Sequence, residues 1–347
     1  MKYFSLSLFA VLVLTACTSL PLPSSSTPNV ANVQAQSSLI RFVVPTGHGY
    51  PEGVAWHATK QAFVVSSLRH GTIGLVDLQG NYRVLSDDPS LISTSGVVVD
   101  VARGRILVTN SDVGVSHKST ELTKFRTAQV VELDMDSGQI RHIYDFAHLS
   151  QGATLSNDLT FDKAGNIYVT DSFQPQIYKV NQADKSVSVL VRDVRLRPNQ
   201  ESEATGLLPN LNGIVYHVDG YLLAGDYVQG KLWKIPLANP TALQEVKLPN
   251  RLKGPDGLVM IDNNTIALIQ TALNGDVMNS YVSYLRTTDN WQSATVMTER
   301  RIDGINGLTT GTLKEGVLWA VNSHYPNLFG NDNADELIQF ELMSVTP

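Results

Sequence analysis

The amino-acid sequence predicts an all-β fold, a six-bladed β-propeller, because one unit of four short strands recurs six times. Helical periodicity is absent from these segments. The clearest unit begins at Asn157-Asp158 and passes through a turn at 164–166 into a strand at 167–170, before two alternating strands at 176–180 and 187–191. Apolar alternation bounded by Gly and Asn is typical of strands and hairpins.

Each repeat opens with a short or polar residue followed by a turn and an apolar strand. The six opening residues are Glu52, Ser95, Asn157, Asn212, Asp256 and Asn306. These starts are 43, 62, 55, 44 and 50 residues apart. A four-stranded blade takes about 40–50 residues, so the longer spacings leave room for loops.

The two ends of the repeat region predict how the ring closes. The last repeat stops at its third strand, near 340–342, and the segment 40–44 precedes the first repeat with no partner of its own. We expect this N-terminal strand to complete the last blade, which limits exposed strand edges. The alternative is an isolated strand on the first blade.

The N-terminal residues predict a secretory signal peptide at 1–16. Lys2 is the only charge before the apolar run 9–14, and small residues lead to Cys17. Leu14-Thr15-Ala16-Cys17 looks like a bacterial lipobox, in which Cys17 is acylated and becomes the new N-terminus. Cys17 is the only cysteine in the chain. The alternative is an ordinary signal peptide with an accidental cysteine.

The predicted organisation is a lipid-anchored flexible tether at 17–38 and a propeller at 39–347. Residues 18–38 carry no charge and are rich in Ser, Thr, Pro, Asn and Gln, a composition that is typical of a tether. We therefore expect a monomer in the bacterial cell envelope, on the periplasmic face or the outer membrane, which contacts the membrane only through its anchor. A formal net charge of −6 argues against nucleic acid as a partner.

The opening residues of the repeats predict a metal centre. The first strand of each propeller blade lines the central channel, so these six residues should converge on one axis. Five of the six carry a carboxylate or amide oxygen, a hard donor set that suits one divalent cation, calcium or magnesium rather than zinc. Asn, Asp and Gly are also common in turns, because they tolerate unusual backbone dihedral angles. The alternative to a metal centre is therefore that these residues only form turns.

Four short motifs give the chain a family resemblance over residues 48–325. They are Pro51-Glu52-Gly53, Ser156-Asn157-Asp158, Leu211-Asn212-Gly213 and Gly254-Pro255-Asp256-Gly257. In these motifs the chain resembles the senescence marker protein, gluconolactonase and luciferin-regenerating enzyme family, and more distantly paraoxonase and diisopropyl fluorophosphatase. The resemblance implies that Glu52, Asn157, Asn212 and Asp256 surround a catalytic divalent cation, for which we expect calcium. The sequence has no evident match to the substrate-binding arginine pair of sugar lactonases.

The resemblance and the six opening residues of the repeats, which we call the hub, together predict a metal-dependent hydrolase of a small-molecule ester, a lactone above all. A bound cation polarises a carbonyl oxygen and lowers the pKa of a bound water. Asp256 is the candidate catalytic ligand that doubles as general base or nucleophile, and Asn157 is expected to orient the substrate. The alternative is a non-catalytic propeller that binds a ligand or protein on the same face.

Further residues are expected near the mouth of the channel. Asn306, His324 and His117 are possible substrate contacts, although a solvated loop histidine is the alternative for both His324 and His117. Long loops on propellers commonly shape such a mouth, and 112–128, 192–210 and 271–281 are the three candidates.

The lipobox yields a direct test. Replacing Cys17 with Ser removes the only thiol that can be acylated, so the Cys17→Ser protein should leave the membrane fraction and appear in the soluble fraction. Fractionation followed by immunoblotting measures this. A variant that stays with the membrane at unchanged mobility would contradict the predicted anchor.

Overall fold

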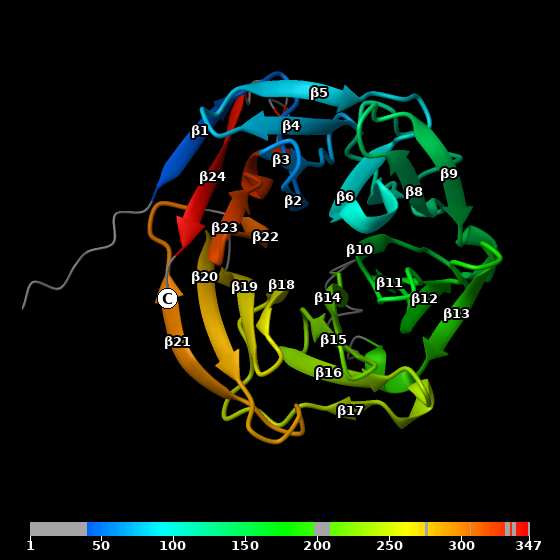
Figure 1. The fold of residues 1–347 in the computed structure, drawn as a ribbon, viewed down its shortest axis with the longest axis vertical. Helices are drawn as coiled ribbons and strands as arrows, with labels where there is room; N and C mark the ends of the chain where they lie inside the picture. Colours follow the sequence, from blue (N-terminus) through cyan, green and yellow to red (C-terminus); the bar gives the residue numbers. More distant parts are fainter. Residues whose placement is uncertain are drawn as a thin grey trace, which may run out of the picture. The chain divides into compact units, whose positions relative to one another are not determined.

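The computed structural model describes residues 40–197, 209–274, 277–305, 307–329, 334 and 338–345. They form six four-stranded antiparallel sheets arranged as blades around a central axis (Figure 1). The predicted six-bladed β-propeller is therefore confirmed. The predicted signal peptide, the tether and Cys17 lie outside the described residues. In the described part of the chain, no helix has the length and apolar character needed to span a membrane.

The strands of each blade run in sequence order from the axis outwards, except in the last blade. Blade 1 contains β2 (Val54–His57), β3 (Ala62–Val65), β4 (Ile73–Asp77) and β5 (Tyr82–Ser86). Blade 2 contains β6 (Ser93–Asp100), β7 (Arg105–Ser111), β8 (Ala128–Asp134) and β9 (Ile140–Asp145). Blade 3 contains β10 (Ser156–Phe161), β11 (Ile167–Asp171), β12 (Gln176–Val180) and β13 (Val187–Arg192).

The second half of the ring repeats this arrangement. Blade 4 contains β14 (Leu211–His217), β15 (Tyr221–Asp226), β16 (Lys231–Pro236) and β17 (Gln244–Glu245). Blade 5 contains β18 (Pro255–Asp262), β19 (Thr265–Asn274), β20 (Val277–Arg286) and β21 (Thr295–Arg301). Blade 6 contains β22 (Leu308–Lys314), β23 (Val317–Asn322), β24 (Gln339–Val345) and β1 (Arg41–Pro45). The described helices are single turns: η1 (Val101–Arg103), η2 (Ala147–Leu149), η3 (Val194–Leu196), η4 (Pro240–Ala242) and α2 (Tyr325–Leu328).

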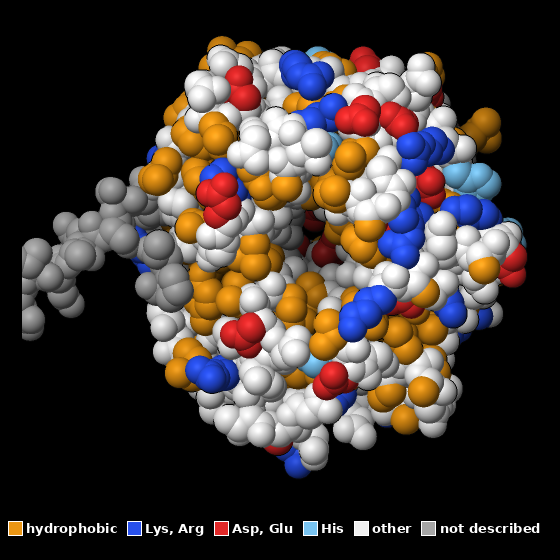
Figure 2. All heavy atoms as spheres, in the orientation of Figure 1, with side chains coloured by type: hydrophobic (Ala, Val, Ile, Leu, Met, Phe, Trp, Pro, Cys, Tyr) orange, Lys and Arg blue, Asp and Glu red, His pale blue; other side chains and the backbone are white. Residues whose placement is uncertain are grey.

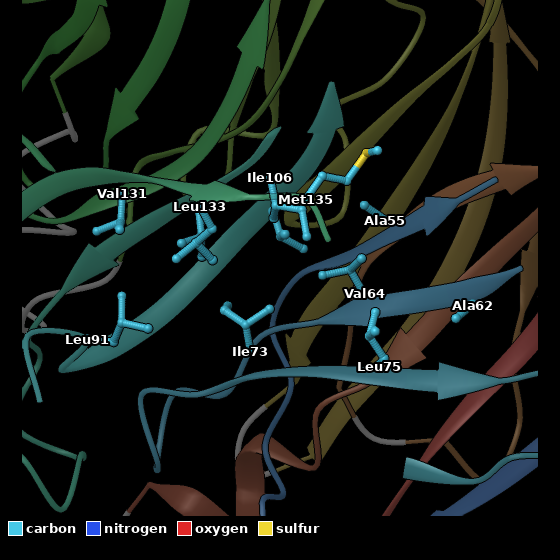
Figure 3. Packing of buried hydrophobic residues seen from close by; sticks show 12 residues of the cluster. Ala55, Ala62, Val64, Ile73, Leu75, Leu91, Ile106, Val131, Leu133 and Met135 are labelled. Atoms are coloured by element: carbon cyan, nitrogen blue, oxygen red, sulfur yellow. The ribbon is translucent and has the colours of Figure 1, made fainter. Parts of the chain in front are cut away.

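The hydrophobic core is divided among the six junctions between neighbouring blades. Each junction holds one cluster of buried apolar side chains. At the first junction, Val64 and Leu75 of blade 1 pack with Ile106 and Val131 of blade 2 (Figure 3). The second strand of a blade therefore buries both of its faces, and all residues of β3, β7 and β11 are buried. The outermost strand β21 is almost entirely exposed.

The N-terminal strand closes the ring, as the sequence predicts. β1 pairs with β24 in antiparallel register, from Arg41 opposite Met343 to Pro45 opposite Gln339. An ion pair strengthens this junction, because the Arg41 guanidinium lies 2.8 Å from the buried Glu341 carboxylate. His324 Nε2 lies 2.6 Å from the other oxygen of Glu341. Burial would raise the pKa of Glu341, but the hydrogen bonds from His324 and Arg41 outweigh it and lower the pKa to about 2.

Glu341→Gln tests this closure. At pH 7 the variant should lose about 1.5–3 kcal/mol of unfolding free energy, the usual contribution of hydrogen bonds to a charged group. A carboxyl whose pKa is lowered by folding stabilises the protein above its unfolded pKa, and this contribution disappears as the pH falls through its folded pKa. The difference should therefore shrink between about pH 4.5 and pH 2.

Denaturant unfolding at several pH values measures the effect. Glu245→Gln is the matched control, because the Glu245 side chain on β17 is 42% exposed where it pairs with Lys231 and Arg251. Equal losses in the two variants would contradict a special role for Glu341, as would a difference that persists unchanged at pH 2.

Candidate functional site

A bulge near the start of the innermost strand positions the central residues of the blades. In β10 the pairing with β11 shifts between Ser156 and Leu159, so that Asn157 and Asp158 stand in the bulge. The corresponding shifts occur between Thr94 and Val97 in β6, Leu211 and Ile214 in β14, Pro255 and Leu258 in β18, and Leu308 and Gly311 in β22. Such bulges re-aim side chains, and here the first bulge residues of β6, β10, β14 and β18 line one central cavity.

Neighbouring bulges touch each other through their backbones. A Cβ added to Gly53, Gly96, Gly213 or Gly257 would collide with the bulge of the next blade. Glycine is therefore required at these positions by close approach. Hydroxyl groups lock the same contacts: Thr170 Oγ1 donates to the Asn212 carbonyl at 2.7 Å, and Thr309 Oγ1 donates to the Glu52 carbonyl at 2.7 Å.

The bulge register corrects one member of the predicted hub. The residue equivalent to Asn157 in blade 6 is Thr309, since the shift in β22 lies between Leu308 and Gly311. Asn306 precedes this strand and lies outside the described residues. The structural ring is thus Glu52, Ser95, Asn157, Asn212, Asp256 and Thr309.

The four predicted metal ligands do come together. Glu52, Asn157, Asn212 and Asp256 line one cavity of about 450 Å³, and each is at most 7% exposed. Ser95 lines the same cavity. The face shown in Figure 2 is hollowed at the centre of the ring, and acidic side chains are visible inside the hollow. The cavity therefore lies at the centre of the propeller.

The carboxyl groups at the axis have no described positive side chain to balance them. No Lys, Arg or His belongs to the described lining of the cavity. Burial raises the pKa of Glu52 well above its ordinary value, and repulsion from Asp256 and Asp158 adds to this. Burial and Asp158 likewise raise the pKa of Asp256, against a hydrogen bond from the Asn212 side chain that lowers it. A bound cation would stabilise the charged forms of these carboxyl groups.

Asp158 is a central carboxylate to which sequence reasoning gave no role. Its oxygens accept hydrogen bonds from the backbone N–H groups of Leu159 at 2.8 Å and Ile214 at 3.2 Å. Burial nevertheless raises its pKa to about 7. It occupies the bulge position that is glycine in four other blades, so aligning the repeats would have singled it out.

The donor set fits a hard divalent cation. The Asn157 Oδ1 atom is buried and has no hydrogen-bond partner among the described residues, which is costly unless a ligand pairs with it. Carboxylate and amide oxygens are the donors that calcium prefers. Within the described part of the chain, no three His, Cys, Asp or Glu side chains are grouped so as to hold a metal. A metal site here would accordingly use amide oxygens beside the two carboxylates.

The cavity wall is apolar and comes largely from loops. Two of the three loops predicted to shape the mouth contribute: Val113 and Phe125 come from the first and Pro209 from the second. The expectation of a third loop at 271–281 is wrong, because β19 runs to Asn274 and β20 starts at Val277, but Thr271 and Met278 of these strands still line the cavity. The remaining wall residues, which the sequence did not single out, are Leu68, Leu155, Phe173, Tyr227, Tyr325 and Phe329. Periodic strand signals carry no information about these loop side chains.

The two candidate histidines lie elsewhere. His324 contacts Glu341 and the Asn322 side chain, whereas its neighbour Tyr325 lines the cavity. Burial raises the pKa of Tyr325, as do the charges of Glu52 and Asp256. The exposed ring of His117 lies 5.1 Å from that of His70. Neither histidine belongs to the described cavity lining.

The fold and this geometry define a six-bladed propeller with an oxygen-lined site on its axis. A family model described as the SMP-30/Gluconolactonase/LRE-like region matches residues 50–280. The chain therefore belongs to the SMP-30/gluconolactonase/LRE-like family.

Solved structures with the same fold include members of several enzyme classes. A gluconolactonase from Xanthomonas campestris is 14% identical over 89% of this chain and 90% of its own, with a TM-score of 0.58. A luciferin-regenerating enzyme is 14% identical over 89% and 96%, with a TM-score of 0.56. A virginiamycin B lyase from Staphylococcus aureus is 11% identical over 89% and 100%, with a TM-score of 0.51. At these identities the similarity concerns the fold alone. No curated protein matches the sequence.

A cation that binds only the folded protein stabilises it by mass action, by about 2.7 kcal/mol at a hundredfold excess over its Kd. A chelator should therefore lower the Tm, and calcium should restore it. Glu52→Gln should reduce the response to calcium, because it removes one of the two predicted carboxylate ligands. Thermal unfolding monitored by circular dichroism measures these shifts.

Glu245→Gln again provides the control, and it should keep the full response to calcium. If the Tm of the wild type changes with neither chelator nor calcium, and elemental analysis finds no metal, the predicted metal centre is contradicted. The Asn and Asp residues that open the repeats would then only form turns.

Proposed function

We propose that this protein is a divalent-metal-dependent hydrolase of a small ester, a lactone above all. The observation that carries the proposal is the convergence of Glu52, Asn157, Asn212 and Asp256 on one buried cavity in a member of this family. Two carboxylates with raised pKa values and an amide oxygen without a described partner support a cation at this point.

Glu52, Asn157, Asn212 and Asp256 would hold the cation. When bound, a divalent cation acts as a Lewis acid on a carbonyl oxygen and lowers the pKa of water. Calcium is the proposed ion because every candidate ligand is a carboxylate or an amide.

Asp256 is proposed as the general base. Its carboxylate takes a proton from water as the water oxygen bonds to the lactone carbonyl carbon. The ring C–O bond then breaks, and the same proton returns to the departing alkoxide, so that lactone and water give a hydroxy acid. The side chain of Asn212, which donates to Asp256, holds that carboxylate in place. Asn157 is proposed to orient the substrate.

The setting of the activity is also a proposal. An acylated Cys17 and a flexible segment to residue 38 would hold the propeller at the membrane of the cell envelope, free to meet small substrates. The signal-like residues before Cys17 support this arrangement.

Asp256→Asn separates chemistry from metal binding. Asn keeps the shape and an oxygen donor but cannot accept a proton, so hydrolysis should fall by about 10²–10⁴-fold while the fold survives. Steady-state hydrolysis of lactones and aryl esters, with and without chelator, measures this loss.

Glu52→Gln is the matched comparison. It should act mainly through weaker metal binding, so excess calcium should restore part of its activity. Near-normal turnover by Asp256→Asn at saturating calcium would contradict the mechanism. An absence of hydrolysis in the metal-loaded wild type would favour a binding propeller instead.

A further inference from the structure

Several polar groups on the wall of the cavity already have hydrogen-bond partners within the protein. Ser95 Oγ lies 2.8 Å from Thr109 Oγ1 and 2.9 Å from the Asn157 carbonyl. The Tyr227 hydroxyl donates to the Thr271 carbonyl at 2.6 Å, and the Thr271 hydroxyl donates to the Leu308 carbonyl. Few described hydrogen-bond donors of the wall are therefore left for the part of a ligand that lies beyond the candidate metal ligands.

Apart from the Tyr325 hydroxyl, the rest of the described wall is apolar. Phe125, Phe173 and Phe329 line it together with aliphatic side chains, and no described Lys, Arg or His does so. A ligand that carries several hydroxyl groups would leave them without partners, which costs about 1–3 kcal/mol for each buried group. An alkyl or aryl group would instead gain free energy by leaving water. An anionic ligand would meet the carboxyl groups of Glu52 and Asp256 and no described Lys, Arg or His of the lining.

One aromatic residue of the wall, Phe125, has a strained backbone conformation. Phe125 has a φ of 59°, in the left-handed region that bulky residues rarely adopt. Its N–H donates to the Asp112 carbonyl at 2.7 Å, and its carbonyl accepts from Thr154 N–H at 3.0 Å. The ring packs edge-on against Phe173, with centroids 5.8 Å apart. Strain of this kind persists where the surrounding structure needs the side chain in one place.

The loop that carries Phe125 is rigidly built around a buried carboxylate. Asp112 accepts hydrogen bonds from Ser119 Oγ at 2.6 Å, Thr123 Oγ1 at 2.7 Å and Gly114 N–H at 2.7 Å. The apolar wall is thus present before any ligand arrives. The cavity has a volume of about 450 Å³, which suits a small molecule.

We infer that the site selects a neutral lactone or ester with an alkyl or aryl substituent, and that it discriminates against polyhydroxylated sugar lactones and anionic esters. This inference rests on the proposed hydrolase function for its reactive group. The apolar wall contacts the substituent, and the carbonyl group of the ligand faces the four candidate metal ligands.

Lactones of one ring size test the inference, because only the substituent changes. In the presence of calcium, kcat/KM should rise from δ-valerolactone to δ-decanolactone by about fourfold for each methylene that the wall buries. Glucono-δ-lactone should be hydrolysed no better than δ-valerolactone. A kcat/KM for glucono-δ-lactone at or above that of δ-decanolactone would overturn the inference while leaving the hydrolase proposal intact.

Binding of slowly hydrolysed lactams separates the two proposals. By calorimetry, δ-decanolactam should bind at least about tenfold tighter than gluconolactam, with a negative heat-capacity change. If no lactone is hydrolysed but this preference holds, the hydrolase proposal fails and the inference stands. If δ-decanolactam binds no tighter than gluconolactam, the inference fails whatever the turnover.

Phe125→Asn places the ligand within the cavity. Asn tolerates the left-handed backbone, so the fold should survive, and a thermal melt checks this. The affinity for δ-decanolactam should fall about tenfold, while that for gluconolactam should not fall. Leu122→Asn in the same loop is the control, because Leu122 is 81% exposed and outside the lining, and it should change neither. An unchanged δ-decanolactam affinity in Phe125→Asn would overturn the inference.

Discussion

The central site depends on the close backbone approach of neighbouring innermost strands at their bulges. Gly53, Gly96, Gly213 and Gly257 leave no room for a Cβ, so each bulge rests directly on the next. Threonine hydroxyls then pin the carbonyls of ring residues such as Glu52 and Asn212. The backbone that carries the candidate ligands is therefore fixed by interblade contacts. Moving the backbone of one candidate ligand would disturb its contacts with the next blade.

This rigidity gathers charges that repel one another. Burial raises the pKa of Glu52, Asp158 and Asp256, Asp158 adds to the rise in both Glu52 and Asp256, and Asp256 adds to that in Glu52, which costs folding free energy in the absence of a cation. Glu341 differs, because hydrogen bonds from His324 and Arg41 lower the pKa of that buried carboxylate. Where the protein needs a carboxylate for its architecture it supplies a partner, and at the axis the described residues supply none.

The repeats made most of the fold predictable. Strand alternation, turn residues and a regular spacing indicate six blades, and the unpaired segment at 40–44 indicates the closing strand. The same repetition brought out Glu52, Asn157, Asn212 and Asp256, because equivalent positions of a propeller meet at the axis.

What the repeats did not reveal depends on local irregularity. Placing the sixth hub residue at Asn306 missed the register of β22, where the bulge falls three residues later. Asp158 was overlooked because it stands beside an obvious candidate in a position that is usually glycine. The aromatic wall comes from loops whose lengths differ between blades, and one of its members, Phe125, adopts a backbone conformation that residue type alone would not suggest.

Closure by β1 has a consequence for how the chain reaches its native state. Arg41 and Glu341 are 300 residues apart, so the contact between them is among the most distant in sequence. Bringing such segments together carries a loop-closure entropy cost that grows with the intervening length until the blades between them are formed. During synthesis β1 emerges first and waits for β24, which emerges last. Until β24 is present, β1 has no partner and β23 has an unpaired edge, which is open to association with other chains.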